Sequence, residues 1–280
     1  MESFRPFVRY ARKHEQRIPT AEVCAVDHRL FFCHGGSAVC EIQGENYPIH
    51  PGTVLYIPGG MPYCFRLGED YPVLSGCNFD FFGDHSFRTE PIPPVAEKGF
   101  CRDAILEKQM SEEAGLFSGP LCLPNVFSLE YKFLEIAEEY IRHNLYWDSY
   151  CGTLLHAVLI RVAQLWQTRN LGVDDRKGDA ILGYIHAHYD EPLTNRRIAE
   201  HFRYHENYIS ELVRKYTGLP LHRYLLRYRM HVAVGLLQST DLPILEIAAK
   251  VAMPDIKHFS KCFKQVMGVP PSQFRIRSGK

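Results

Sequence analysis

Length, composition and charge indicate a globular protein with more than one domain. The chain has 280 residues, 46% of them hydrophobic and 23% charged, a balance that excludes a largely disordered chain. Lysine plus arginine and aspartate plus glutamate both number 32, so the formal net charge is zero. Residues 171–280 nevertheless hold 17 basic and 11 acidic side chains, whereas residues 1–170 hold 15 and 21. A basic C-terminal part behind an acidic front predicts two functions on one chain.

The sequence shows no sign of membrane insertion or secretion. No apolar run approaches the ~18–20 residues that a membrane helix needs, and the charged first residues lack the apolar centre of a signal peptide. We therefore expect a cytoplasmic protein. None of the nine cysteines pairs with another at CxxC spacing, which favours reduced, mostly buried thiols over a zinc or thioredoxin-type site. A redox or metal-sensing role stays open as the alternative.

Residues 21–82 are predicted to form β structure. Short runs rich in Val, Ile, Leu, Phe and Tyr, such as HRLFFC and TVLYI, alternate with glycine-bearing turn signals. Many short strands at a spacing of roughly 8–12 residues favour a sandwich or barrel. Prolines interrupt residues 84–125, so we expect an irregular segment there that wraps the barrel, with a helical turn in CRDAILEKQM.

Two amphipathic helices are predicted next, over residues 127–144 and 149–169. The short connection NLYWDS makes them an antiparallel hairpin. The hairpin has more apolar residues than one inward stripe uses, with Phe127, Leu145, Tyr146 and Trp147 left over. Surplus apolar surface of this kind predicts a partner face and hence a homodimer. Charges placed at Leu155 and Leu159 are expected to break it.

The C-terminal segment contains an internal repeat, in which residues 193–225 align with residues 242–275. The matching positions are Ile198 with Ile247, Ala199 with Ala248, and Gly218 with Gly268. The shift between the copies grows by one residue along the repeat, so one residue is inserted in or near the turn. Each copy has the pattern of a short helix, a tight break and a longer helix ending at glycine. This is the pattern of a helix-turn-helix unit.

The second helix of each unit has one apolar and one polar face. The side chains expected to point inward are Ile209, Leu212, Val213 and Tyr216 in the first unit and Ile256, Phe259, Phe263 and Val266 in the second. The side chains assigned to DNA binding are Asn207, Ser210, Glu211 and Arg214 in the first unit and Lys257, Ser260, Lys261 and Lys264 in the second. Polar side chains of these kinds reach base edges and phosphates. Two such faces in one basic module favour DNA binding over two merely solvated helices.

Residues 179–277 resemble the C-terminal domain of AraC/XylS-type transcription regulators. The matching residues are Gly218, Tyr224, Arg229, Ala233, Leu236, Leu237, Ile244, Ile247, Ala248, Phe259, Ser260, Lys261, Phe263, Lys264, Gly268, Pro270, Pro271, Ser272, Gln273, Phe274 and Arg275. The resemblance implies seven helices, with a long helix over about residues 221–238 that joins two helix-turn-helix units. Ala252 and Met253 stand where the family usually has Gly-Phe. Alanine at a turn position that often needs glycine puts the register of the second unit in question.

Residues 22–83 resemble the jelly-roll sensor of the same family, a relative of the cupins. The matching residues are Gly52, Pro58, Gly60 and Tyr63, followed by Asn78, Phe79 and Asp80. Cupin enzymes have a histidine at the position of Tyr63 and an HxH…E cluster on an earlier strand, so we expect neither a metal centre nor a cofactor. The candidates for ligand binding inside the barrel are His34, Glu41, Tyr63, Phe65 and Asn78. For Tyr63 and Phe65 a role in the core is the alternative.

These observations predict an α+β multidomain protein. The expected parts are a cupin-like jelly roll for ligand sensing over 1–125, a helical dimerisation hairpin over 126–170, a linker over 171–177 and a double helix-turn-helix domain over 178–280. We expect a transcription regulator rather than an enzyme. Its expected partners are double-stranded DNA, a small-molecule effector such as a sugar or related metabolite, a second copy of the chain, and RNA polymerase. The alternatives are a cupin-type enzyme with a helical appendage, or a DNA-binding regulator whose front only dimerises or senses redox state.

Overall fold

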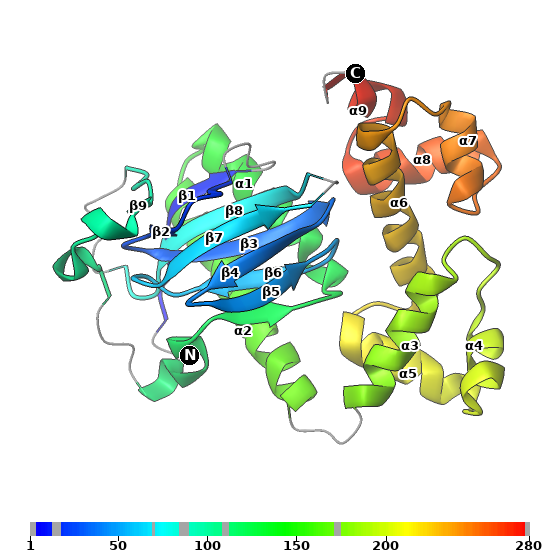
Figure 1. Ribbon diagram of the computed structural model, residues 1–280, viewed down its shortest axis with the longest axis horizontal. Helices are drawn as coiled ribbons and strands as arrows, with labels where there is room; N and C mark the ends of the chain where they lie inside the picture. Colours follow the sequence, from blue (N-terminus) through cyan, green and yellow to red (C-terminus); the bar gives the residue numbers. More distant parts are fainter. Residues whose placement is uncertain are drawn as a thin grey trace. The chain divides into compact units, whose positions relative to one another are not determined.

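The chain folds into two compact units, 1–167 and 168–280, shown here in a computed structural model (Figure 1). The structure describes residues 4–12, 18–68, 71–83, 90–107, 112–170 and 175–277. The first unit combines antiparallel β-sheets with a helical hairpin, and the second is helical, as the α+β assignment predicts. The boundary near residue 167 places the hairpin in the same unit as the sheets. Most of the linker predicted at 171–177 lies outside the described residues, and helix α3 already begins at Asp175.

Two five-stranded sheets build the first unit, and every strand pair in them is antiparallel. The first sheet has the order β1 (Phe7–Arg12), β8 (Val73–Asp80), β3 (His28–Gly35), β6 (Val54–Ile57) and β10 (Leu121–Leu123). The second has the order β5 (Glu45–Ile49), β4 (Ala38–Ile42), β7 (Pro62–Leu67), β2 (Val23–Cys24) and β9 (Val95–Ala96). Apolar side chains from both sheets, including Phe31, Leu55, Cys40 and Phe65, form one core cluster.

The two sheets differ in what covers their outer faces. Burial alternates along β4, whose outer face is partly exposed, whereas β3 and β8 are buried along their whole length. The reason is that helix α1 (Glu130–Arg142) packs on the first sheet, with the rings of Phe32 and Phe133 at 5.3 Å. A sheet buried on both faces loses the alternating polar pattern that otherwise marks its inside.

Short 3-10 turns connect the sheets to the hairpin. They are η1 (Glu97–Gly99), η2 (Arg102–Ala104), η3 (Glu112–Ser118) and η4 (Phe127–Leu129). The helical turn expected in residues 101–110 is present as η2, and residues 108–111 lie outside the described part of the chain. The irregular character predicted for 84–125 therefore holds for the residues that are described.

The predicted hairpin consists of α1 and α2 (Trp147–Asn170). The Sγ of Cys151 on α2 lies 3.7 Å from the carbonyl oxygen of Ile136 on α1, so the two helices pack closely. Two details of the prediction are wrong. Phe127 is fully buried and is not surplus surface, and Leu155 and Leu159 are also fully buried, so charges there would disrupt the core of this unit instead of a dimer contact.

The cysteines behave as the sequence predicts. All nine are free thiols, and Cys33, Cys40, Cys77 and Cys151 are among those that are buried. Burial raises the pKa of Cys33 to about 12, so this thiol stays protonated and packs as a small apolar group.

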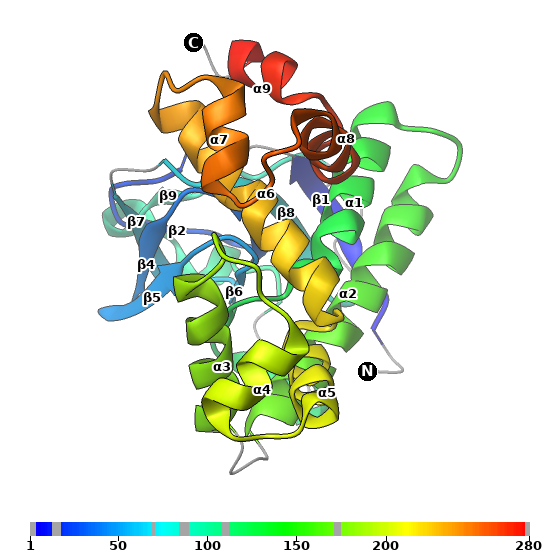
Figure 2. The ribbon, with the colours of Figure 1, turned by 90° about the vertical axis from the view of Figure 1, so that its right-hand side faces the viewer.

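The second unit contains seven helices within residues 175–277, in agreement with the family resemblance. They are α3 (Asp175–Ala187), α4 (Asn195–Phe202), α5 (Glu206–Thr217), α6 (Leu221–Ser239), α7 (Ile244–Lys250), α8 (Ile256–Met267) and α9 (Pro271–Arg277). The long α6 runs from the α4–α5 pair to the α7–α8 pair (Figure 2). Its N-terminal part packs on α5, and its C-terminal part joins a core cluster that includes Met230, Ile247 and Phe263.

Candidate DNA interface and ligand cavity

The first helix-turn-helix unit is held by a small buried contact set and by caps at both helix ends. Thr194 caps α4, where its Oγ1 accepts a hydrogen bond from the Arg197 N–H at 3.2 Å. Ile198 and Ala199 are buried, and the small alanine allows α5 to cross closely. The chain leaves α4 through Arg203, which has φ of 58°. These features set the angle at which α5 is presented.

The second helix-turn-helix unit repeats this geometry. Ala252 has φ of 53° at the position equivalent to Arg203, and the Met253 N–H donates to the Ala248 carbonyl at 2.9 Å. The Oδ1 of Asp255 then caps α8 by accepting hydrogen bonds from the N–H groups of Lys257 and His258, at 2.9 and 3.1 Å. Alanine thus adopts the left-handed conformation that glycine favours, so the departure from the family pattern leaves the turn intact.

The residue inserted between the two copies is located in the turn, as the repeat predicts. In the first helix-turn-helix unit, Tyr204 is followed directly by the N-cap residue His205. In the second, Pro254 separates Met253 from the N-cap residue Asp255. A proline directly before a helix cap fits an extended backbone. The two helix-turn-helix units therefore have the same two helices, and the turn between these helices is one residue longer in the second unit.

The polar faces of α5 and α8 are open to solvent. Asn207, Glu211 and Arg214 are exposed and Ser210 is half-buried on α5, and Lys257, Lys261 and Lys264 are exposed and Ser260 is half-buried on α8. The apolar stripe of α5 is buried as predicted. On α8, Phe259 and Phe263 are buried, but Ile256 is 40% exposed and Cys262 is buried. The assignment of Ile256 to the inward face is wrong because it occupies the first helical position, beyond the reach of the core.

The candidate interface has the charge pattern of a nucleic-acid contact. Three lysines lie on the open face of α8, and Arg214 and Lys215 lie in the last turn of α5. Positive side chains beside short polar ones allow phosphate contacts and base contacts from the same helix. The acidic Glu211 lies on the same helix as Arg214 and Lys215 and is also exposed.

Comparison with known proteins identifies the family of the helical unit, residues 168–280. A family model described as a helix-turn-helix domain matches residues 198–277. The HTH-type transcriptional activator AarP of Providencia stuartii is 33% identical over 96 residues, which cover 34% of this chain and 71% of that protein. The chain belongs to the AraC family of transcription regulators. The helix-turn-helix domain is therefore that of a DNA-binding transcription regulator, and α5 and α8 are its candidate recognition helices.

Other similar proteins match the same part of this AraC-family chain. The uncharacterized HTH-type transcriptional regulator YisR of Bacillus subtilis is 36% identical over 92 residues, which cover 33% of this chain and 32% of that protein. The match to the regulator YtdP of the same organism spans only 13% of YtdP. The C-terminal domain of AraT from Geobacillus stearothermophilus, a solved structure, is 35% identical, with coverage of 36% and 84% and a TM-score of 0.35.

The AraC-family regulator has a cavity of about 580 Å³ between its two sheets. It is lined by Tyr10, Ile18, Pro19, Val23, Arg29, Phe31, Tyr63, Phe65, Leu74, Asn78, Pro91, Ile92, Pro93 and Pro94. Tyr63, Phe65 and Asn78, three of the five residues named from sequence, are among them. This volume suits a small organic molecule.

His34 and Glu41 do not line the cavity, which corrects their placement. His34 is buried on the opposite face of β3, where its Nδ1 lies 3.2 Å from the Glu130 Oε1 and its Nε2 lies 2.6 Å from the Ser75 Oγ. Glu41 forms an ion pair with Arg66 on the outer face of the second sheet. Both follow from strand alternation, because Phe31, Cys33 and Cys40 are the residues of β3 and β4 in the inner core cluster.

Sequence reasoning missed Arg29, a charged residue that is buried in the cavity wall. Its Nη2 lies 2.8 Å from the Asp27 Oδ1 and donates to the Ile92 carbonyl at 2.7 Å. An arginine inside the apolar strand HRLFFC was the available signal, because a guanidinium is rarely buried unless it is paired.

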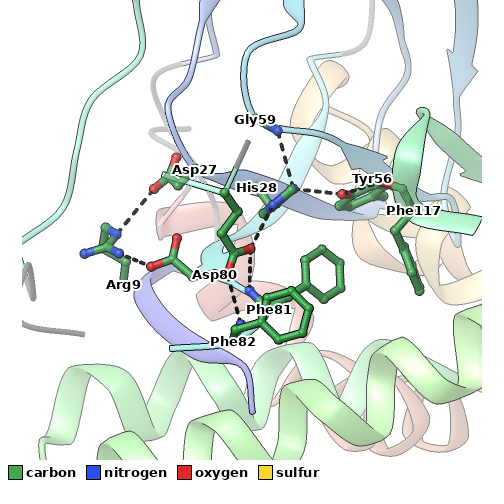
Figure 3. A network of polar contacts seen from close by, with 10 residues as sticks. Arg9, Asp27, His28, Tyr56, Gly59, Asp80, Phe81, Phe82 and Phe117 are labelled. Atoms are coloured by element: carbon green, nitrogen blue, oxygen red, sulfur yellow. Dashed lines mark hydrogen bonds and ion pairs between the residues drawn. The ribbon is translucent and has the colours of Figure 1, made fainter. Parts of the chain in front are cut away.

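Asp27, the partner of Arg29, belongs to a set of buried polar contacts with Arg9 and Asp80 (Figure 3). Arg9 forms ion pairs with Asp80 and, at 3.9 Å, with Asp27. Burial raises the pKa of Asp80 to about 6, against the lowering effect of Arg9. In a separate group, His28 lies 3.1 Å from Glu107 and 2.8 Å from the Tyr56 hydroxyl. The carboxylate of Glu107 also accepts hydrogen bonds from the N–H groups of Phe81 and Phe82.

The described residues contain no group of three or more His, Cys, Asp or Glu side chains arranged to hold a metal ion. No helix among the described residues is long and apolar enough to cross a membrane.

Proposed function

We propose that the chain is a transcription regulator that responds to a small-molecule effector bound in its β-sheet unit, a cupin-like jelly roll. The observation that carries this proposal is the cavity of about 580 Å³ on the same chain as two helix-turn-helix units. A cavity of this size, walled by aromatic side chains with a few polar groups, is typical of small-molecule sites. The regulator acts in the cytoplasm, on promoters read by RNA polymerase.

The contacts behind the cavity offer a route to the hairpin. Leu74 lines the cavity, and the next residue, Ser75, faces the opposite side of the sheet and contacts His34. His34 in turn contacts Glu130, the first residue of α1. A ligand that shifts β8 therefore acts on the start of α1 through two hydrogen bonds. An effector changes DNA binding only if it binds two states of the chain unequally, and this route gives the two states a structural basis.

The hairpin is the proposed contact between two copies of the chain. Its exposed large apolar side chains are Tyr131, Ile141, Leu145, Tyr146, Tyr150 and Ile160. Leu145 and Tyr146, at 84% and 72% exposure, are two of the residues that the sequence marks as surplus. A dimer through this surface holds two DNA-binding units on one operator, so effector binding changes how both units engage DNA.

The sensing proposal is tested by screening metabolites against the full chain. Both tryptophans, Trp147 and Trp166, lie in α2, so their fluorescence follows unfolding of the first unit. An effector should raise the unfolding temperature of this unit and change the affinity for a DNA duplex selected from random sequences. Filling the cavity with Val23→Phe should abolish both effects and preserve DNA binding. Val39→Phe, on a half-buried side chain outside the cavity lining, is the matched control. A metabolite response that survives Val23→Phe would contradict the proposal.

The dimer proposal is tested by sedimentation of the chain at micromolar concentration. Ile141→Glu combined with Leu145→Glu should convert the dimer to a monomer, because each carboxylate would be buried at the contact. Leu245→Glu, at an apolar side chain that is 55% exposed in the second unit, should leave the dimer intact. A monomeric wild-type chain would refute the dimer.

A further inference from the structure

Three neighbouring strands place a row of polar side chains on one wall of the cavity. Tyr10 on β1 is directly paired with Asn78 on β8, and Asn78 is directly paired with Arg29 on β3. All three residues line the cavity. Because side chains at paired positions of an antiparallel sheet point to the same face, the row forms one hydrogen-bonding edge.

Two members of the row are buried, and one of them has hydrogen-bonding capacity unused. Arg29 and Asn78 are 6% and 5% exposed. The Nε of Arg29 has no hydrogen-bond partner, and the Asn78 side chain lies beside it in the cavity wall. Buried donors are almost always paired in folded proteins, so an unpaired donor in a cavity wall indicates the place of a ligand acceptor.

Apart from Tyr63, the remaining walls are apolar. Phe31, Phe65 and Leu74 come from the strands, and the proline-rich segment 91–94 closes one side. Arg29 ties that segment in place through its bond to the Ile92 carbonyl. A sugar carries a hydroxyl on nearly every carbon, and most of these would face apolar side chains here. The cavity therefore favours a ligand with an apolar body and a single polar end.

The charges around the row favour an uncharged ligand. Arg29 and Arg9 face two carboxyl groups, Asp27 and Asp80, and the four groups form a continuous chain of ion pairs. Two guanidinium groups thus already balance two carboxylates. Burial also raises the pKa of Asp27 and of Asp80, which means that this part of the unit disfavours additional negative charge. A ligand carboxylate would be a third anion beside two cations.

We propose that the effector is a neutral organic molecule with an aromatic or branched apolar body and one carbonyl-type acceptor. The carbonyl oxygen accepts hydrogen bonds from Asn78 and the guanidinium edge of Arg29, and the apolar body lies against Phe31, Phe65 and the proline-rich segment. This inference rests on the proposed sensing function and names the chemical class of its ligand.

The test uses a matched set of probes on the full chain. A naphthyl methyl ketone, the corresponding naphthoate anion and ethylnaphthalene share one ring system and differ in the polar end. Calorimetric titration should show the ketone binding at least about tenfold more tightly than either of the others, since one good hydrogen bond is worth about a factor of ten. Arabinose in excess should not displace the ketone.

Variants identify the hydrogen-bonding edge. Asn78→Leu should weaken ketone binding about tenfold and leave ethylnaphthalene binding unchanged or tighter. The matched control, Asn46→Leu, replaces an exposed asparagine on β5 and should change neither. Arg29→Lys gives a second reading if Asn78→Leu unfolds, and it too should weaken the ketone selectively.

The outcomes separate the ligand class from the sensing function. Tighter binding of naphthoate, displacement by arabinose, or equal loss of ketone and hydrocarbon binding in Asn78→Leu would each overturn the neutral-carbonyl class. These results would leave the sensing function standing, because each still shows a ligand in the cavity. Sensing itself fails if no ligand of any class alters DNA binding, or if the response survives Val23→Phe.

Discussion

Arg203 and Ala252 occupy the same position in the two helix-turn-helix units, and both have left-handed backbone conformation, with φ of 58° and 53°. Each is the residue at which the chain turns from the first helix toward the recognition helix. The two side chains have nothing in common, so the backbone conformation is imposed by the contacts of the flanking helices. A turn with this geometry in both helix-turn-helix units gives α5 and α8 equivalent presentations.

The strain at this turn predicts a stabilising substitution. A side chain in the left-handed region costs about 1 kcal/mol of folding free energy. Glycine removes this strain, but it loses more chain entropy on folding, which offsets part of the gain. Ala252→Gly should therefore raise the stability of the α7–α8 unit by about 0.5 kcal/mol. Hydrogen exchange of the slowest amides in α7 and α8 measures this change. Ala249→Gly, exposed within α7, is the control and should lower the stability by about 1 kcal/mol. A loss of stability in Ala252→Gly would show that the turn requires its Cβ.

The pKa of Asp80 predicts how stability depends on pH. Burial raises this pKa to about 6, well above that of an unfolded aspartate at about 4. The folded state therefore binds more protons than the unfolded state between these values, and stability from this group grows as the pH falls from about 6 to about 4. Wild type should gain stability over Asp80→Asn across this window, and the difference between them should be flat above about pH 7.

Urea unfolding followed by tryptophan fluorescence reports this difference for the first unit, which holds both tryptophans. Asp80→Asn keeps the side-chain shape and one acceptor for Arg9. A difference that moves the opposite way as the pH falls would mean that the ion pair with Arg9 outweighs burial.

Arg214 and Lys264 are expected to contact phosphates, because they lie one turn beyond the residues assigned to bases on each recognition helix. Arg214→Ala and Lys264→Ala should each weaken binding to all duplexes about equally and lower the slope of log affinity against log salt by about one. Titrations of the full chain at several salt concentrations measure the slope. Lys98 is exposed in the β-sheet unit, and Lys98→Ala should not change the slope. A slope that both recognition-helix variants leave unchanged would remove these residues from the interface.

The sequence carried most information where one pattern repeats. The two copies of Ile-Ala and of the closing glycine predicted both helix-turn-helix units, and the shift of one residue predicted an insertion in or near the turn, which the structure locates at Pro254. Helix periodicity also predicted the buried stripe of α5. Ile256 failed because periodicity says nothing about how far the core extends along a helix, and here the core reaches Phe259 but not the first helical residue.

The cavity was harder to predict for a physical reason. Alternation puts Arg29 and His34 on opposite faces of β3, but because β3 is buried on both faces the sequence did not reveal which face is the inner one. Only the packing of α1 on the outer face decides this, and that contact joins residues nearly a hundred positions apart, such as His34 and Glu130. Tyr63 and Phe65 were placed correctly because they lie on the face of β7 that joins the inner core cluster, and Asn78 because it shares a face of β8 with Leu74 of that cluster.

The most direct test of the account is a selection of binding sites from randomised duplexes by wild type and by Glu211→Ala. Glu211 is exposed on the open face of α5, among residues assigned to DNA. If it accepts a hydrogen bond from a cytosine amino group, the variant should lose about 1–3 kcal/mol on the wild-type consensus and its preference at one base pair should relax. An unchanged consensus with tighter binding to every sequence would mean that the carboxylate merely repels phosphates and that this face of α5 does not read bases.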